Sequence, residues 1–426
     1  MNTESRTIHF PEGFGERTIF RQVYPDPQTQ LERWQRLYAR YQKTFDSSSP
    51  RFFSSPGRAE LCGNHTDHNG GLVLAAAVNL DSIAVAGKNG SDKITIYAEG
   101  YDTPFTIDLE NLKPVENERG TTAALIRGIA SRMAALGFSI GGFDARITSD
   151  VLVGSGLSSS ASVEILIASI FNALFNESSI DPVTMAVIGQ YAENNFFGKP
   201  CGLMDQIACA VGGVVVIDFK DREQPTVNKV TTNFNDSDQI LVIVNTGGSH
   251  ADLTDDYSAI PREMAAVANA FGKQRLIGLT TDELNANLND VRTMAGDRAV
   301  LRAIHFLEEN QRVIKQVQAL EAHDLETFRR LANESGDSSW RLLQNCYSPY
   351  QPREQGVALA LTLTKRFIGE LGTGACRIQG GGFAGTIQAW LPKGELGRFV
   401  ELMEPVFGGN CVVAPSIREV GARELE

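Results

Sequence analysis

The chain has 426 residues, more than one ordinary hydrophobic core holds, so two or three domains of roughly 100–200 residues are expected. With 42% hydrophobic and 21% charged residues it has the composition of a soluble globular protein, which excludes a largely disordered chain. The formal charge is −12, from 39 Lys and Arg against 51 Asp and Glu. This acidity argues against general nucleic-acid binding, because phosphate backbones would be repelled.

Membrane segments, disulfides and zinc sites are not indicated either. No apolar run approaches the roughly 20 residues that cross a bilayer, and the first residues lack the basic and apolar segments of a signal peptide. The six cysteines are scattered without a CxxC pair, which indicates reduced thiols. We therefore expect a cytoplasmic protein that binds small molecules, with neither nucleic acid nor membrane as a partner. The sequence leaves the oligomeric state open, and a monomer is compatible with it.

Apolar residues recur at three- and four-residue spacing in the predicted helices, and in short runs between Gly, Asn and Asp in the predicted strands. Because helices and strands are mixed in both halves, the fold class is α+β. A boundary near 219–225 predicts an N-terminal domain of residues 1–219 and a C-terminal domain of residues 220–426. In chain order we predict a helix at 31–45, strands and hairpins over 51–109, helices at 121–136 and 163–174, strands at 213–219 and 239–245, helices from about 260 to 371, strands at 375–379 and 386–391, a helix at 394–407 and a strand at 411–415.

The first of four polar or glycine-rich clusters covers residues 56–71, with the sequence PGRAELCGNHTDHNGG. It holds an arginine, two histidines, two carboxylates and an Asn-Gly-Gly turn. Fixed donors and acceptors on a loop between strands suit a polyhydroxy ligand, since each hydroxyl group both donates and accepts hydrogen bonds. A polar hairpin with Asn69-Gly70 as its turn explains the same residues equally well.

The second cluster, VGSGLSSSA at residues 153–161, directly precedes a predicted helix. Small residues expose backbone N–H groups, and the helix N-terminus adds the positive end of a dipole, so the loop can hold an anion. No Lys-Ser or Lys-Thr pair follows a glycine, so this is not a Walker loop. A bound phosphate would need amides, serines and a metal ion to neutralise it. A glycine turn followed by serine caps is the alternative.

Two further clusters lie later in the chain. Glu193 precedes Asp205 by twelve residues, and Asp205 stands between apolar residues on both sides. Such a carboxylate can act as a general base or a metal ligand, or it can cap a helix. Residues 380–385, GGGFAG, fit G-x-G-x-x-G, but a strand is predicted after them where a dinucleotide fingerprint needs a helix. We interpret them as a glycine turn that permits close backbone approach, or as a tight β connection.

The order of these clusters is more specific than any one of them. PGRAELCGNHTDHNGG, VGSGLSSSA, CGLMDQ and RIQGGGFAG, in this order, resemble the galactokinase branch of the GHMP sugar and metabolite kinases. The segment NTGGSHADLTDDYSAIPRE at 245–263 is similar to a further galactokinase pattern, and the correspondence runs from about residue 51 to 416. The resemblance implies a two-domain GHMP-kinase-like fold with the active site in the interdomain cleft.

The resemblance also implies a role for each motif residue. Asp205 corresponds to the residue proposed to accept the proton of the sugar's anomeric hydroxyl, and Arg58 to the arginine that stabilises the transferring phosphoryl group. Ser160 and Glu193 would hold Mg²⁺. The phosphates of ATP would be bound by Gly154, Ser155, Gly156, Leu157, Ser158, Ser159 and Ser160, and the sugar by Asn64, His65, Thr66, Asp67 and Tyr257.

Together these expectations describe an ATP-dependent kinase for the C1 hydroxyl of D-galactose. In-line phosphoryl transfer needs a positioned hydroxyl, a carboxylate beside it and cations around the phosphate. The family motif has a glutamate where this chain has Asn64, and because that glutamate contacts the C6 hydroxyl, an altered C6 specificity is a hypothesis. A kinase for a C6- or C2-modified galactose and a galactose- and ATP-binding sensor without turnover are the alternatives. Retention of Arg58, Ser160, Glu193 and Asp205 argues against the sensor.

Overall fold

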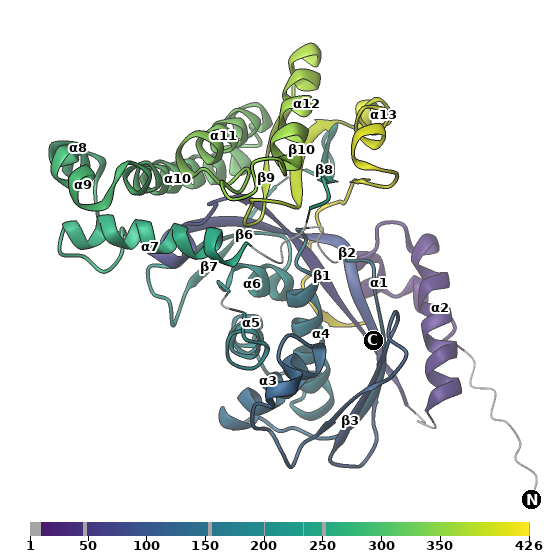
Figure 1. Ribbon diagram of the computed structural model, residues 1–426. Coiled ribbons are helices and arrows are strands. Elements are labelled where there is room, and N and C mark those ends of the chain that lie inside the picture. Colours follow the sequence, from purple (N-terminus) through teal and green to yellow (C-terminus); the bar gives the residue numbers. More distant parts are fainter. Residues whose placement is uncertain are drawn as a thin grey trace, which may run out of the picture.

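The computed structural model describes residues 10–45, 49–151, 156–199, 201–232, 234–248 and 253–425, which form two β-sheets with helices packed against both (Figure 1). The larger sheet has the strand order β12-β1-β2-β5-β3-β4, with β6 pairing with β2 and β7 with β6, and the smaller has the order β11-β8-β10-β9. The strands are β1 (Arg51–Cys62), β2 (Leu72–Lys88), β3 (Lys93–Ala98), β4 (Phe105–Asp108), β5 (Phe143–Ser149), β6 (Val214–Asp218), β7 (Thr226–Val230), β8 (Gln239–Asn245), β9 (Ala375–Gln379), β10 (Thr386–Pro392), β11 (Val412–Val413) and β12 (Arg423–Glu424).

The helices fall into groups that follow the chain (Figure 1). Those on the larger sheet are α3 (Thr122–Ala135), α4 (Ser159–Phe175), α5 (Pro182–Ala192) and α6 (Met204–Val211), with the π-helical turn η4 (Glu193–Phe197) between the last two. A second group comprises α7 (Thr254–Ala270), α8 (Thr281–Ala286), α9 (Leu288–Ala295), α10 (Asp297–Glu321), α11 (Leu325–Ser338) and the π-helical turn η5 (Ser339–Leu343). α12 (Gly356–Leu371) and α13 (Leu396–Phe407) share an apolar core with the smaller sheet. Single 3₁₀ turns occupy Phe14–Glu16, Asp67–Asn69, Glu116–Glu118 and Lys393–Glu395.

The β1–β2 pair forms the centre of the larger sheet and carries the first sequence cluster. Its antiparallel register runs from Arg51↔Ala86 to Cys62↔Leu74, with a shift at Pro56, which has no N–H to donate to the ladder. Nearly every residue of β1 is buried, since α4, α6, α10 and α11 all pack against it. A strand covered in this way is almost continuously apolar or small rather than alternating.

The N-terminal segment folds against the same sheet. Its helices, α1 (Thr18–Val23) and α2 (Pro27–Thr44), form an aromatic core around Trp34 and Phe52 that also includes Leu425 near the other end of the chain. β12 pairs with β1, so the last residues return to the larger sheet after the chain has built the smaller one. Figure 1 shows α2 lying along this side of the sheet.

The α+β prediction is confirmed, the structure contains two sheets, and most predicted elements are present. The helix predicted at 31–45 begins at Pro27, and α1 before it was missed because six residues are too few for a helical stripe. The strand predicted at 411–415 has only two paired residues. The predicted division at 219–220 lies between β6 and β7, which pair with each other, so the limits of the two domains stay a prediction.

Candidate functional site

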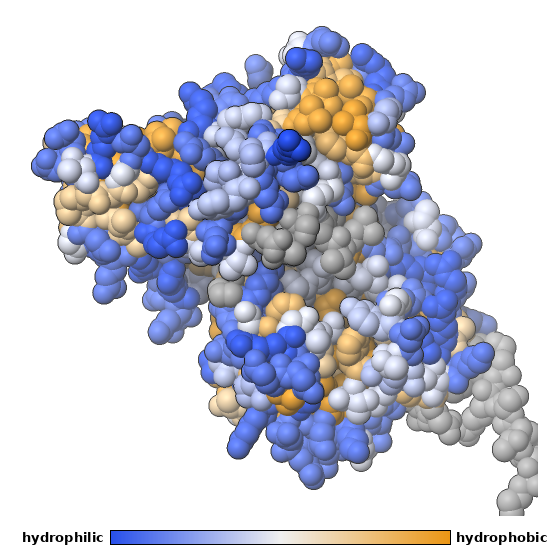
Figure 2. Space-filling view, in the orientation of Figure 1, coloured by the Kyte–Doolittle hydropathy of each residue, from blue (hydrophilic) through white to orange (hydrophobic). Residues whose placement is uncertain are grey.

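Hydrogen bonds bring the four sequence clusters together where the two sheets meet. The backbone N–H of Arg58, in the first cluster, donates to the Leu157 carbonyl of the second at 3.0 Å. The Gln379 amide, which precedes the fourth cluster on β9, donates to the Gly156 carbonyl at 3.1 Å. At the side below α7, the surface is indented between the part that carries α7 and the part that carries α5 (Figure 2).

The third cluster joins them through an arginine–carboxylate pair. Arg58 Nε donates to Asp205 Oδ1, and Arg58 Nη2 to Asp205 Oδ2, each at 2.7 Å. The Ser158 hydroxyl also donates to Oδ2, and Arg58 Nη1 donates to the Gly156 carbonyl. The carboxylate that could act as a base thus lies between an arginine of the first cluster and a serine of the second.

This pair is shielded on one side and open on the other. The Arg58 side chain is 6% exposed, whereas that of Asp205 is 31% exposed. Burial disfavours the charge on Arg58, but Asp205 outweighs burial and raises the pKa of the guanidinium. Asp205 lies in the first turn of α6, where the helix dipole favours a negative charge. Ser158 has a φ of 57°, an uncommon conformation for a residue with a side chain and one that recurs at functional sites.

Ser160 and Glu193 form a second oxygen-rich pair. The Ser160 hydroxyl lies 3.4 Å from Glu193 Oε1, and Lys199 Nζ lies 3.7 Å from the same oxygen. Glu193 is only 3% exposed and begins the π-helical turn after α5. Mg²⁺ prefers oxygen ligands and usually takes one or two carboxylates together with water and phosphate oxygens. A hydroxyl and a carboxylate at this distance fit such an ion, and the described residues contain no group of three or more His, Cys, Asp and Glu that could hold a metal.

The loop after β1 presents His65 and Asp67. His65 Nε2 donates to the Gly381 carbonyl at 2.8 Å, and burial lowers the pKa of this imidazole to about 4. Burial alone would raise the pKa of Asp67, but the hydrogen bonds and charge of His68 outweigh it and lower the pKa to about 2. Gly202 of the third cluster lies against Asp67, and a side chain at position 202 would overlap Asp67 Oδ2.

Asn64 and Thr66, both predicted to bind the sugar, have fully buried side chains. Asn64 Nδ2 donates to Glu60 Oε1 at 2.9 Å and to the Gly380 carbonyl at 2.8 Å, and its Oδ1 accepts from Asn345 at 2.7 Å. The Thr66 hydroxyl lies within 2.8 Å of two backbone carbonyls of its own loop. Both amide hydrogens of Asn64 are used in these bonds, so a sugar hydroxyl could only donate to the second acceptor site of its buried Oδ1. The altered C6 specificity inferred from this residue stays a hypothesis.

Of the remaining predicted residues, some lie at the site and others lie outside the described residues. Tyr257, on α7, donates its hydroxyl to the Gly382 carbonyl at 2.8 Å, and its ring centroid lies 6.4 Å from that of His65. Burial, reinforced by the charge of Asp256, raises the pKa of Tyr257 to about 12. Leu157 is fully buried, and Ser159 begins α4. Gly154 and Ser155 lie outside the described residues.

A buried polar network beneath the loop was missed by sequence reasoning. Arg377, fully buried on β9, donates to Glu60 Oε1 at 2.8 Å and to the Glu60 carbonyl at 2.7 Å. His305, on α10, lies 3.0 Å from the Asn64 carbonyl. A charged residue in the apolar strand ACRIQ needs a buried partner, so Arg377 was a signal that the sequence contained.

Two family signatures match this chain. The galactokinase galactose-binding signature covers residues 39–88, and the GHMP kinases N terminal domain covers residues 124–213. The galactokinase of Clostridium tetani is 29% identical over 362 residues, which cover 84% of this chain and 88% of that protein. The galactokinase of Actinobacillus pleuropneumoniae is 29% identical over 384 residues, 89% of this chain and 94% of that protein.

Solved structures share the fold. The crystal structure of Lactococcus lactis galactokinase complexed with galactose aligns with a TM-score of 0.76 at 24% identity, covering 90% of this chain and 97% of that one. The mevalonate kinase of Methanococcus jannaschii aligns with a TM-score of 0.61 at 15% identity, covering 87% and 99% of the two chains.

Proposed function

Since this chain belongs to the GHMP kinase family, in its galactokinase branch, we propose that it transfers the γ-phosphoryl group of ATP to the anomeric C1 hydroxyl of D-galactose. The observation that carries the proposal is the Arg58–Asp205 pair, which is hydrogen-bonded to Ser158 of the serine loop (residues 154–160). Gly202, three residues before Asp205, lies against Asp67 of the sugar loop (residues 63–71). The galactokinase signature and the curated galactokinases support the same substrate. A kinase for a modified galactose and a sensor without turnover are not favoured by these relatives.

Asp205 would hold and deprotonate the attacking hydroxyl. Each carboxylate oxygen has more than one acceptor site, so Asp205 can bond a sugar hydroxyl on its exposed side while it keeps Arg58. The guanidinium would place positive charge where phosphoryl oxygens would lie. Because phosphoryl transfer passes through a loose transition state, positioning and charge stabilisation would supply most of the rate.

The serine loop would hold the nucleotide. Residues 154–160 lead into α4, whose N-terminal N–H groups and dipole favour phosphate. Ser160 and Glu193 would hold Mg²⁺, which supplies charge neutralisation on the phosphate oxygens when it is bound. His65 and Asp67 of the sugar loop and Tyr257 of α7 would contact the sugar, whereas Asn64 and Thr66 would maintain the shape of the loop through their buried bonds.

Two further observations concern the chain as a whole. Within the described ranges no helix is both long and apolar enough to span a bilayer. All six cysteines are free thiols, five of them buried. The thiols support a cytoplasmic location as part of the proposal, because such environments keep cysteines reduced.

A coupled ADP-release assay with Mg-ATP and a panel of hexoses tests the proposed function. We expect turnover on galactose, a product whose phosphate is attached at C1 by ³¹P NMR, and loss of turnover in Asp205→Asn. Asp102→Asn, which changes an exposed carboxylate between β3 and β4, is the matched control and should retain full activity. Turnover only on another hexose would replace galactose as the substrate, and no turnover on any hexose would refute the kinase assignment.

A further inference from the structure

A buried amide lies behind the Ser160–Glu193 pair. Gln206 Nε2 donates to Glu193 Oε2 at 3.0 Å and to Glu164 Oε2 at 3.0 Å. Gln206 and Glu164 are fully buried and Glu193 is 3% exposed. The three residues come from α6, α4 and the π-helical turn η4, so one amide group joins three separate helical segments.

This arrangement of buried polar groups lowers the stability of the folded protein, so a contribution to stability does not explain it. Two buried carboxyl groups share a single amide, and Glu164 forms no ion pair with any described residue. Glu164 Oε1 and Gln206 Oε1 are buried without a hydrogen-bond partner. Apolar side chains would fill the same space without this penalty, as the neighbouring Ile165 and Ile167 do on α4. The polar cluster therefore calls for a role other than packing.

Its geometry indicates that role. The Gln206 amide holds Oε2 of Glu193, and the other oxygen, Oε1, is left facing the Ser160 hydroxyl at 3.4 Å. Glu164 accepts the second hydrogen of the same amide and so fixes its orientation. A carboxylate oriented by buried hydrogen bonds binds a cation more tightly than one that rotates freely. On α6, Gln206 faces inward while its neighbour Asp205 remains 31% exposed.

We propose that Gln206, anchored by Glu164, is a positioning residue that orients the Glu193 carboxylate toward the divalent cation that accompanies the nucleotide. This inference rests on the proposed function for the identity of the nucleotide, but it concerns metal binding and not the sugar. It predicts that loss of the Gln206 amide lowers the affinity for the divalent cation and leaves the affinity for galactose unchanged.

The test measures Mn²⁺ binding in the presence of ADP by electron paramagnetic resonance of the free ion. Gln206→Leu, of similar size but without a donor, should weaken Mn²⁺ binding by about 10–100-fold, the usual effect of losing a group that orients a metal ligand. Galactose affinity by calorimetry should change by less than about twofold. Gln316→Leu is the matched control, since Gln316 is also fully buried and its side-chain amide has no hydrogen-bond partner among the described residues.

A second pair of variants protects the test against misfolding of Gln206→Leu. Glu164→Gln keeps an oxygen that can accept from Gln206, so Mn²⁺ affinity should stay within about threefold, whereas Glu164→Ala removes the anchor and should weaken it by about tenfold. Equal Mn²⁺ affinity in wild type, Gln206→Leu and Glu164→Ala would overturn the inference. Equal weakening in both Glu164 variants would also overturn it, because charge and not anchoring would then be responsible. A wild-type protein that binds Mn²⁺ with ADP but does not turn over galactose would refute the proposed substrate alone.

Discussion

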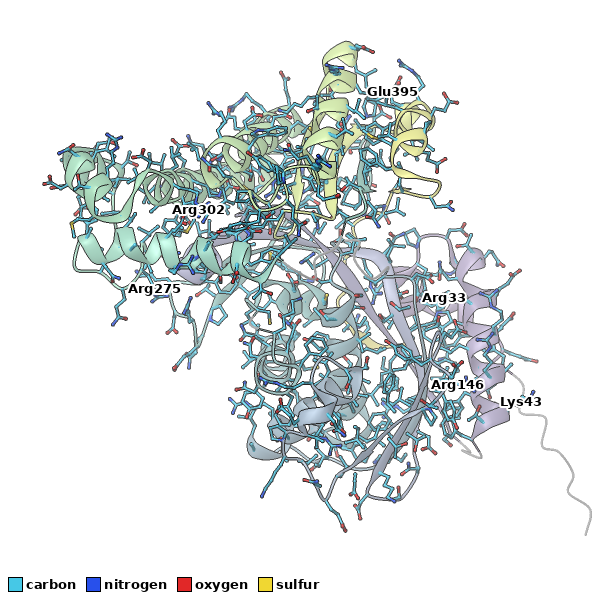
Figure 3. All side chains as sticks on the ribbon, viewed as in Figure 1. Arg33, Lys43, Arg146, Arg275, Arg302 and Glu395 are labelled. Atoms are coloured by element: carbon cyan, nitrogen blue, oxygen red, sulfur yellow. The ribbon has the colours of Figure 1, made fainter. Side chains whose placement is uncertain are left out.

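Two arginine–carboxylate clusters in this protein use the same chemistry in opposite ways. Asp81 on β2 is fully buried and receives Arg33 at 2.6 Å and Arg418 at 3.2 Å, so it ties the N-terminal helices and the C-terminal tail to the larger sheet. Figure 3 shows Arg33 between α2 and this sheet. Asp205 accepts two hydrogen bonds from Arg58, one on each carboxylate oxygen, but about a third of its side chain stays exposed.

The difference lies in what remains available for bonding. Asp81 also accepts from Tyr24 and from Ser54, so its oxygens are surrounded by the protein's own donors. Among the described residues, Asp205 accepts side-chain hydrogen bonds from Arg58 and Ser158 alone, and it keeps a face open to solvent. A closed cluster can contribute only to the fold, whereas an open one can exchange a water molecule for a substrate hydroxyl. The following predictions test this distinction, from the largest expected effect to the smallest.

Asp205→Asn should reduce kcat for galactose by about 10²–10⁴-fold, the range for loss of a general base. The free energy of unfolding should fall by no more than about 2 kcal/mol, because the amide oxygen still accepts one hydrogen bond from Arg58. Steady-state kinetics and urea denaturation measure the two quantities. Full activity in this variant would show that the open pair is structural after all.

Asp81→Asn should have the opposite effects, with a large loss of stability and little change in kcat. It leaves two buried arginines without their counter-charge, so the free energy of unfolding should fall by about 3–5 kcal/mol, while kcat of the folded protein stays within about threefold. Burial would raise the pKa of Asp81, but Arg33 and Arg418 outweigh it and the pKa is lowered. The stabilisation that ionised Asp81 gives to the folded protein is therefore fully present above its unfolded pKa, and it is lost as the pH falls through its lower folded pKa. A variant as stable as wild type would contradict the structural role.

The free energy of unfolding should fall in mild acid because of His65. Its pKa of about 4 in the folded protein lies below the ordinary value of 6.5, so the unfolded chain binds a proton more readily. The stability it contributes is complete above pH 6.5 and is lost as pH falls toward 4, by up to about 3 kcal/mol. Urea denaturation of wild type and His65→Gln at pH 7 and pH 5 measures it. An identical pH slope in the two proteins would show that His65 is not responsible.

Gly202→Ala should affect the site more than the fold. The new methyl group would overlap Asp67 Oδ2, so the loop must shift, and the KM for galactose should rise about tenfold, equivalent to about 1.4 kcal/mol. Gly369→Ala on α12 is the control, since a methyl group there meets nothing within 4 Å and should stabilise the helix by about 0.5–1 kcal/mol. An unchanged KM in Gly202→Ala would show that Asp67 does not contact the sugar.

Much of this molecule could be predicted because its signals are local. The helical stripes, the apolar strands and the glycine and serine clusters depend on neighbours within a few residues, and nearly all of them appear where predicted. The helix predicted after the serine cluster is present as α4, and the anion site expected at its N-terminus stays a prediction. Short elements such as α1 carried too few residues to show a period.

The partners of buried polar groups could not be predicted in the same way. Arg377 and Glu60 are separated by 317 residues, and Arg58 and Asp205 by 147, and each pairing depends on how strands and helices pack. Asn64 shows the consequence, since a residue read from its motif as a sugar contact is fully enclosed by Glu60, Gly380 and Asn345. Only the folded chain shows which polar groups are already satisfied.

The amino-acid sequence by itself thus determined the α+β class, the four clusters and the kinase family that their order resembles. The tertiary structure decided which members of those clusters meet, which remain open to a substrate and which are committed to internal bonds. The physical reason is that helices and strands are selected by local periodicity and backbone preference. The bonding of a buried carboxylate or amide is instead set by whichever donors the packing of distant segments places beside it.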